Sequence, residues 1–133
     1  MKNKTTYLID DDKLSIKLMS MLISKNNFCE EIISFHNPLT ALEELKINAS
    51  DPSRLPDVIL LDLNMPLLDG WQFLDEFQLI SFAKKIIVFI VSSSIDPYDL
   101  EKTKDYPIIK SYIIKPLTSE KLKKTSVLIE NEI

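Results

Sequence analysis

The chain has 133 residues, of which 45% are hydrophobic and 27% are charged, and its formal net charge is −4. This length and balance are typical of one globular domain, which we place at residues 1–133, and the acidic charge argues against binding to nucleic acid. No apolar run suits a signal peptide or reaches the roughly 18 residues of a membrane span, and a single cysteine excludes an internal disulfide. We therefore expect a cytoplasmic protein that binds neither nucleic acid nor membrane.

Five short apolar runs, separated by longer segments, predict the strands of a sheet. They lie at residues 6–9, 32–35, 58–61, 86–91 and 112–114. Most are continuously apolar and do not alternate, which is typical of parallel strands that are covered on both faces.

The segments between these runs have helical spacing and helix start signals. The first helix, at 14–25, is predicted from Ile16, Met19 and Ile23, and a cap followed by proline predicts helices at 39–47 and 96–106. Asp69 opens the third predicted helix, which carries Phe73, Phe77 and Ile80. The fifth begins near Thr118, with Leu122, Ser126, Ile129 and Ile133 along one side. The fourth helix has little apolar material, which indicates a marginal or a movable element.

Strand and helix alternate five times, which predicts an α/β fold: a doubly wound, five-stranded parallel sheet with helices on both faces. Ligands of such a sheet bind beyond the carboxyl ends of its strands. At those ends stand polar residues, namely Asp10, Asp11 and Asp12, then Asp62, then Ser92, Ser93 and Ser94, and finally Lys115.

Several carboxylates in one place repel each other unless a cation joins them, and Mg²⁺ prefers oxygen ligands. With Mg²⁺ bound, Asp62 could attack a phosphoryl group while Lys115 and Ser92 hold its oxygens. Each feature also has a plain structural interpretation: the three aspartates could cap the first helix, and the serines could form a polar turn. Asp69 and Gly70 are interpreted as a turn in which glycine permits a positive φ.

Four segments, in order, resemble the signature of the receiver domains of two-component response regulators. They are LIDDD at 8–12, VILLDLNMP at 58–66 with Asp69 and Gly70, IVSS at 90–93, and YIIKP at 112–116. The resemblance covers nearly the whole chain and implies the flavodoxin-like form of the predicted fold. The stretch at 106–110 departs from the pattern of many relatives, which have small residues and glycine there.

The resemblance implies a role for each matched residue. Asp62 would be the phosphoacceptor. Mg²⁺ would be bound by Asp11, Asp62 and the Asn64 backbone carbonyl, with Asp10 a less direct partner. Lys115 would contact the phosphate and precede a cis peptide bond to Pro116. Ser92, with Ser93 as the alternative, would be the switch hydroxyl, and the rotamer of Tyr112 would report the switch state, although a half-buried strand tyrosine is equally compatible with the sequence.

The implied function is that of a stand-alone response regulator and not of an enzyme, beyond its own phosphorylation and dephosphorylation. A histidine kinase or phosphotransfer protein would donate the phosphoryl group. The fourth helix, fifth strand and fifth helix would then bind a downstream protein, and no output domain is expected after the last helix. Two alternatives stay open: a small phosphatase of the haloacid-dehalogenase type, which would use Asp10 and Asp12, and a binding module that never carries phosphate.

Overall fold

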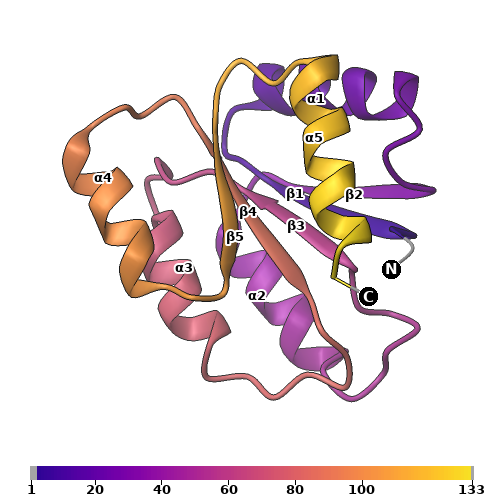
Figure 1. Cartoon of the computed structure of the whole chain (residues 1–133). Helices are drawn as coiled ribbons and strands as arrows, with labels where there is room; N and C mark the ends of the chain where they lie inside the picture. Colours follow the sequence, from indigo (N-terminus) through magenta and orange to yellow (C-terminus); the bar gives the residue numbers. More distant parts are fainter. Residues whose placement is uncertain (1–2, 133) are drawn as a thin grey trace.

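The computed structural model describes residues 3–132, and within them strands and helices alternate along the chain (Figure 1). The strands are β1 (Thr5–Ile9), β2 (Glu31–Phe35), β3 (Val58–Leu61), β4 (Ile87–Ser92) and β5 (Ile109–Ile114). The α-helices are α1 (Lys13–Lys25), α2 (Pro38–Ile47), α3 (Gly70–Phe77), α4 (Pro97–Lys102) and α5 (Ser119–Glu130). A short 3-10 helix, η1 (Thr103–Asp105), follows α4 directly.

The five strands form one parallel sheet in the order β2-β1-β3-β4-β5. Helices α1 and α5 cover one face of this sheet, and α2, α3 and α4 lie on the other side (Figure 1). The predicted fold is therefore confirmed. The order places β3 at the centre, so residues that follow β1, β3 and β4 come out beside one another at the carboxyl edge.

Each face of the sheet has its own apolar core, which explains the continuously apolar strands. In β3, Ile59 and Leu61 pack with the residues of α2 and α3. The alternate residues Val58 and Leu60 pack with those of α1 and α5. Every side chain of this strand is consequently buried, and the strand forms a rigid floor below its carboxyl end.

The predicted caps are confirmed, and three predicted boundaries are wrong by more than one residue. Asn37, Asp69, Asp96 and Thr118 all accept backbone N–H bonds at helix starts. Helix α3, however, ends at Phe77 and not near residue 80, and α4 ends at Lys102. Strand β5 begins at Ile109, because an edge strand tolerates the exposed Lys110 and the half-buried Ser111 that broke the apolar pattern.

Helix α5 buries Leu122, Thr125 and Ile129, so the predicted buried side is correct except that Thr125 takes the place expected of Ser126. The Thr125 hydroxyl donates to the carbonyl of Lys121, which satisfies it inside the core. The predicted Ile133 lies outside the described residues. Among residues 3–132, no helix combines the length and the apolar character that crossing a membrane requires.

Candidate functional site

Three carboxylates meet at the carboxyl edge of the sheet. Ile9 of β1 is paired with Leu61 of β3, so the residues that follow, Asp10 and Asp62, leave the sheet side by side. The Asp62 amide donates to the carbonyl of Ile9 at 3.0 Å, which fixes this register. One carboxylate oxygen from each of Asp10, Asp11 and Asp62 lies within 4.8 Å of the other two. The sequence prediction that separate strands bring these side chains together is thus confirmed.

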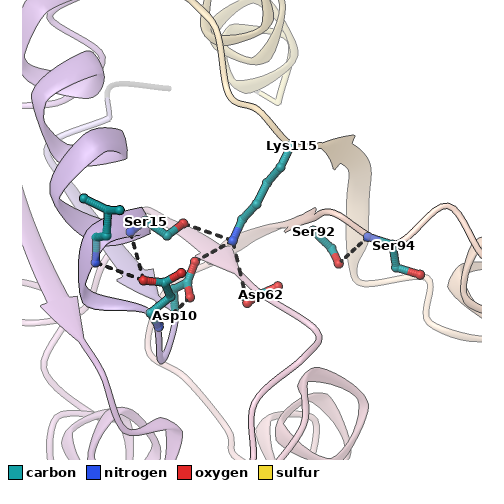
Figure 2. Close-up of polar contacts among 8 residues, drawn as sticks. Asp10, Ser15, Asp62, Ser92, Ser94 and Lys115 are labelled. Atoms are coloured by element: carbon teal, nitrogen blue, oxygen red, sulfur yellow. Dashed lines mark hydrogen bonds and ion pairs between the residues drawn. The ribbon is translucent and has the colours of Figure 1, made fainter.

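Lys115 enters the same pocket from the end of β5, and its peptide bond to Pro116 is cis, as expected. Its Nζ lies 2.7 Å from Asp10 Oδ2 and 3.7 Å from Asp62 Oδ2 (Figure 2). It also lies 3.1 Å from the hydroxyl oxygen of Ser15 in the first turn of α1. The ammonium group therefore bridges two buried carboxylates while a third partner holds it in place.

The consecutive aspartates 10–12 have three different environments. Asp10 is completely buried, and its Oδ1 accepts the Asp12 amide at 2.9 Å while its Oδ2 binds Lys115. Asp12 caps α1, since its side chain accepts the amides of Leu14 and Ser15. The helix-cap interpretation is therefore correct for Asp12. Asp11 is exposed at the mouth of the pocket, where its carboxylate can face a cation.

Asp62 is a buried carboxylate whose environment disfavours its charge. Burial raises its pKa from 3.8 to about 6, and the neighbouring Asp10 adds to this effect. Lys115 and the amides of Asn64 and Leu63 act in the opposite direction without cancelling it. A divalent cation beside Asp62 would offset both the cost of burying its charge and the repulsion from Asp10. The all-oxygen donor set of Asp11 and Asp62 fits Mg²⁺, while the contribution of the Asn64 carbonyl stays a prediction.

The loop that carries Asp62 packs tightly against the start of α3. A Cβ built on Gly70 would lie 2.8 Å from the Asp62 carbonyl oxygen and 2.9 Å from the Leu63 Cα. The expectation of a positive φ at Gly70 is wrong, because the single glycine of the chain is not in that region. Glycine is required here for the close approach of two backbone segments, which positions the phosphoacceptor candidate.

Ser92 is the last residue of β4 and is completely buried, whereas Ser93 is exposed. This difference favours Ser92 over Ser93 as the hydroxyl that belongs to the pocket. The Ser92 hydroxyl oxygen accepts the Ser94 amide at 3.2 Å, and the two residues face each other in Figure 2. The hydroxyl of Tyr112, a half-buried residue, donates to the Ser94 carbonyl at 2.9 Å. The switch roles of Ser92 and Tyr112 stay predictions.

Sequence reasoning missed two parts of the site. Ser15 was not singled out, although its place in the helix that follows the acidic run puts it at the correct edge of the sheet. Trp71 was left without a role, yet its indole N–H donates to Asp99 of α4 at 3.2 Å. Nothing in the spacing of Trp71 and Asp99 predicts the contact between them, because α3 and α4 are brought together only by the fold.

Comparison with known proteins agrees with this geometry. The family model for the response regulator receiver domain matches residues 7–126. The chain is 32% identical to a two-component response regulator from Cytophaga hutchinsonii of known structure, over 98% of this chain and 99% of that one, with a TM-score of 0.86.

Two curated relatives show the range of proteins that contain such a domain. A probable methanogenesis regulatory protein from Methanothrix harundinacea is 28% identical, over 89% of this chain and 76% of that protein. A protein-glutamate methylesterase/protein-glutamine glutaminase from Rhodopseudomonas palustris is 32% identical, but the match covers 72% of this chain and only 24% of that protein. The similarity is thus to the shared domain, and the chain belongs to the response regulator receiver domain family, whose members accept phosphoryl groups in two-component signalling.

Proposed function

We propose that the chain accepts a phosphoryl group on Asp62 from a histidine kinase or a phosphotransfer protein, with Mg²⁺ as cofactor, and that this changes a protein-binding surface. The observation that carries the proposal is the convergence of Asp10, Asp11 and Asp62 within 4.8 Å, with Lys115 bound to two of them. Asp10 and Asp62 are buried like charges, which destabilise the fold, so their pairing has little purpose in a purely structural site.

In the proposed reaction, an Asp62 carboxylate oxygen forms a bond to phosphorus as the bond to the donor's leaving group breaks. Asp11, Asp62 and the Asn64 carbonyl would hold Mg²⁺, which neutralises the charge of the transferred group. Lys115 lies 3.7 Å from Asp62 Oδ2 and would pair with a phosphoryl oxygen. Asp10 and Ser15 orient that ammonium group, so it needs little reorganisation when the phosphoryl group arrives.

The surface beside the pocket suits a helical phosphodonor. Leu14, Leu18 and Met21 of α1 are 64%, 58% and 62% exposed, and they follow one another at helical spacing. A recess runs from Leu14 and Leu18 to Lys115, Pro116 and Leu117 after β5. An apolar stripe that borders a charged site matches a partner helix that carries a phosphorylated residue next to apolar ones.

Exposed apolar side chains on three further elements support the proposed output face. They are Ile95 before α4, Tyr98 and Leu100 on α4, Ile114 on β5 and Val127 on α5. Helix α4 has a loose attachment, since its residues, all within the described part of the chain, include none that is buried. A small shift of this helix would therefore change the surface at low energetic cost.

The phosphatase alternative is disfavoured by one specific contact. That mechanism would need Asp12 as a free acid beside Asp10, but the Asp12 carboxylate accepts two amides at the start of α1. A binding module without phosphate makes a different experimental prediction, since it would gain no mass from a small phosphodonor.

Intact-mass measurement after incubation with acetyl phosphate and Mg²⁺ tests the proposal. The unmodified chain should gain one phosphoryl group, and Asp62→Asn should gain none. Asp57→Asn is a matched control, because Asp57 is a buried aspartate at the other end of the same strand, bound to Lys84. This control should be phosphorylated like the unmodified chain.

Two results would contradict the proposal. If Asp62→Asn gains a phosphoryl group as readily as the unmodified chain, Asp62 is not the acceptor. If the unmodified chain gains none even with Mg²⁺ at saturation, the proposal fails in the way that the binding-module alternative predicts.

A further inference from the structure

Ser15 lies at the edge of the carboxylate pocket and contacts Lys115. The Asp12 side chain accepts the Ser15 amide at 3.3 Å, which holds this residue in the first turn of α1. The Ser15 side chain points toward the end of Lys115, and 3.1 Å separates its hydroxyl oxygen from Nζ (Figure 2). An ammonium group has only donors, so the hydroxyl oxygen accepts this bond. Ser15 is therefore part of the pocket.

The three contacts of the Lys115 ammonium group are unequal. Asp10 Oδ2 lies 2.7 Å from Nζ and the Ser15 hydroxyl oxygen lies 3.1 Å from it, which are hydrogen-bond distances. Asp62 Oδ2 lies 3.7 Å from Nζ, which is an ion pair without a hydrogen bond. The ammonium group is thus drawn toward the end of β1 and the start of α1, and it compensates the charge of Asp62 only in part.

We propose that Ser15 is a positioning residue that holds the Lys115 ammonium group back from Asp62, so that both carboxylate oxygens of Asp62 stay available. The inference rests on the proposed function and deepens it. In that function, Asp62 needs one oxygen for Mg²⁺ and the other for the bond to phosphorus. An ammonium group hydrogen-bonded to Asp62 would compete with both.

Electrostatics give the sign of the effect on Mg²⁺ binding. Mg²⁺ and an ammonium group are attracted to the same carboxylate and repel each other, and each of these interactions strengthens as the separation falls. Without the Ser15 hydroxyl, Lys115 loses one acceptor, and Asp62 can take its place. The ammonium group should then move closer to Asp62 than 3.7 Å and weaken the binding of Mg²⁺ there, although Ser15 itself is not a metal ligand.

Titration with Mg²⁺ in the absence of any phosphodonor, followed by the NMR signals of the backbone amides, tests the inference. Ser15→Ala removes the hydroxyl, and Ser15→Thr retains it. Ser24→Ala is the matched control, because Ser24 is an exposed serine of the same helix. We expect Ser15→Ala to raise the Kd for Mg²⁺ roughly three- to tenfold, and the other two variants to stay within about twofold of the unmodified chain.

Two further measurements separate positioning from a merely structural role. Crystal structures of the unmodified chain and of Ser15→Ala, both without metal, should show the distance from Lys115 Nζ to Asp62 Oδ2 shortened in the variant to about 3 Å. Urea unfolding should give Ser15→Ala about the same stability as Ser24→Ala, because a bond from Lys115 to Asp62 replaces the lost one. A structural role for the hydroxyl would lower the stability of Ser15→Ala alone and leave the ammonium group in place.

The outcomes separate this inference from the function on which it rests. If Ser15→Ala binds Mg²⁺ as tightly as the unmodified chain, or keeps Lys115 at its original distance from Asp62, the inference is wrong. Equal weakening in Ser15→Thr or Ser24→Ala would also overturn it, since the Ser15 hydroxyl would not be the cause. In these cases the proposed function stands, provided that the unmodified chain still gains a phosphoryl group. If the unmodified chain neither binds Mg²⁺ nor gains a phosphoryl group, the proposed function itself fails, and the inference with it.

Discussion

Strand β3 has a buried aspartate at each end, and the two behave in opposite ways. Asp57 precedes the strand and Asp62 follows it, and each is 7% exposed. Burial alone raises the pKa of both. At Asp57 the Lys84 ammonium and the amides of Thr5 and Lys4 outweigh burial and lower the pKa, whereas at Asp62 the pKa rises to about 6.

The surrounding donors, and not depth, set the direction in which the pKa of each buried carboxylate shifts. Asp57 accepts hydrogen bonds at 2.8, 3.1 and 2.8 Å and joins β1 to the segment before β4. Asp62 has a lysine at 3.7 Å that it shares with the closer Asp10. The buried charge of Asp57, at the amino-terminal edge of the sheet, is thus balanced by its partners. The charge of Asp62, at the carboxyl edge, would be balanced only if a cation were added.

Asp57→Ala should give the largest loss of stability. It leaves two backbone amides and a lysine without their acceptor, and we expect the free energy of unfolding at pH 7 to fall by about 2–4 kcal/mol. Because the folded-state pKa of Asp57 lies below 3.8, its stabilisation is present above that pH and is lost as the pH falls through the lowered value. Urea unfolding at pH 7 and at pH 3 measures both effects. Equal losses at the two values would show that the charge of Asp57 is unimportant.

Gly70→Ala tests whether the backbone that carries Asp62 at the carboxyl edge is rigid, although the charge of Asp62 is not balanced there. The new methyl group would collide with the backbone of Asp62 and Leu63, which cannot move aside as a side chain can. We expect about 2 kcal/mol of destabilisation and slower phosphorylation by acetyl phosphate. Glu76→Ala, at an exposed position of the same helix, is the control. A Gly70→Ala variant with unchanged stability and rate would mean that the loop is adaptable.

Asp62→Asn should have the opposite sign to Asp57→Ala. The folded state holds the Asp62 proton more tightly than the unfolded state, so the unmodified chain loses stability as the pH rises from about 4 to about 6. The variant escapes this loss and should be more stable by about 1–2 kcal/mol at pH 7, with no advantage below pH 3.8. Thermal unfolding with and without Mg²⁺ is the measurement, and Mg²⁺ should reduce the difference. A variant less stable at pH 7 would contradict the comparison.

Of these variants, Tyr106→Phe should change the free energy of unfolding least. The Tyr106 hydroxyl donates to the exposed Asp75 at 2.8 Å, and burial, followed by this bond, raises the pKa of Tyr106 to about 12. Loss of one bond to a carboxylate that water can reach should cost about 1 kcal/mol or less. Urea unfolding provides the value, and an ultraviolet pH titration checks the pKa of Tyr106 in the unmodified chain. If Tyr106→Phe lowers the free energy of unfolding as much as Asp57→Ala does, burial of the acceptor carboxylate does not explain the difference expected between the two variants.

Local patterns in the sequence were sufficient for most of the fold and for the centre of the site. Apolar runs, helical spacing and cap residues predicted the five strands and five α-helices found within residues 3–132, because a sheet covered on both faces imposes continuous burial. Strand ends then located Asp10, Asp62 and Lys115. The start of β5 was not predictable in this way, since an edge strand follows its neighbour and not an apolar period.

The sequence could not predict the contacts between elements that are distant along the chain. The Trp71–Asp99 bond joins residues on α3 and α4, and the Trp71 and Tyr106 rings lie 5.1 Å apart. The different contacts of Asp10 and Asp12 also depend on the directions of their side chains, which the residue type alone does not reveal. Gly70 was assigned to a turn because close backbone packing leaves no sequence pattern other than the glycine itself.

The division of tasks within the run 10–12 determines which replacements each position can accept. Position 12 needs only a short side chain that accepts hydrogen bonds, so serine, threonine or asparagine would serve a helix start equally well. Position 11 opens to solvent and has room for the additional methylene of glutamate. Position 10 is enclosed and holds Lys115, so we expect a neutral residue there to be the most damaging of the three replacements. Three identical neighbours would therefore give three different substitution profiles in a saturation library.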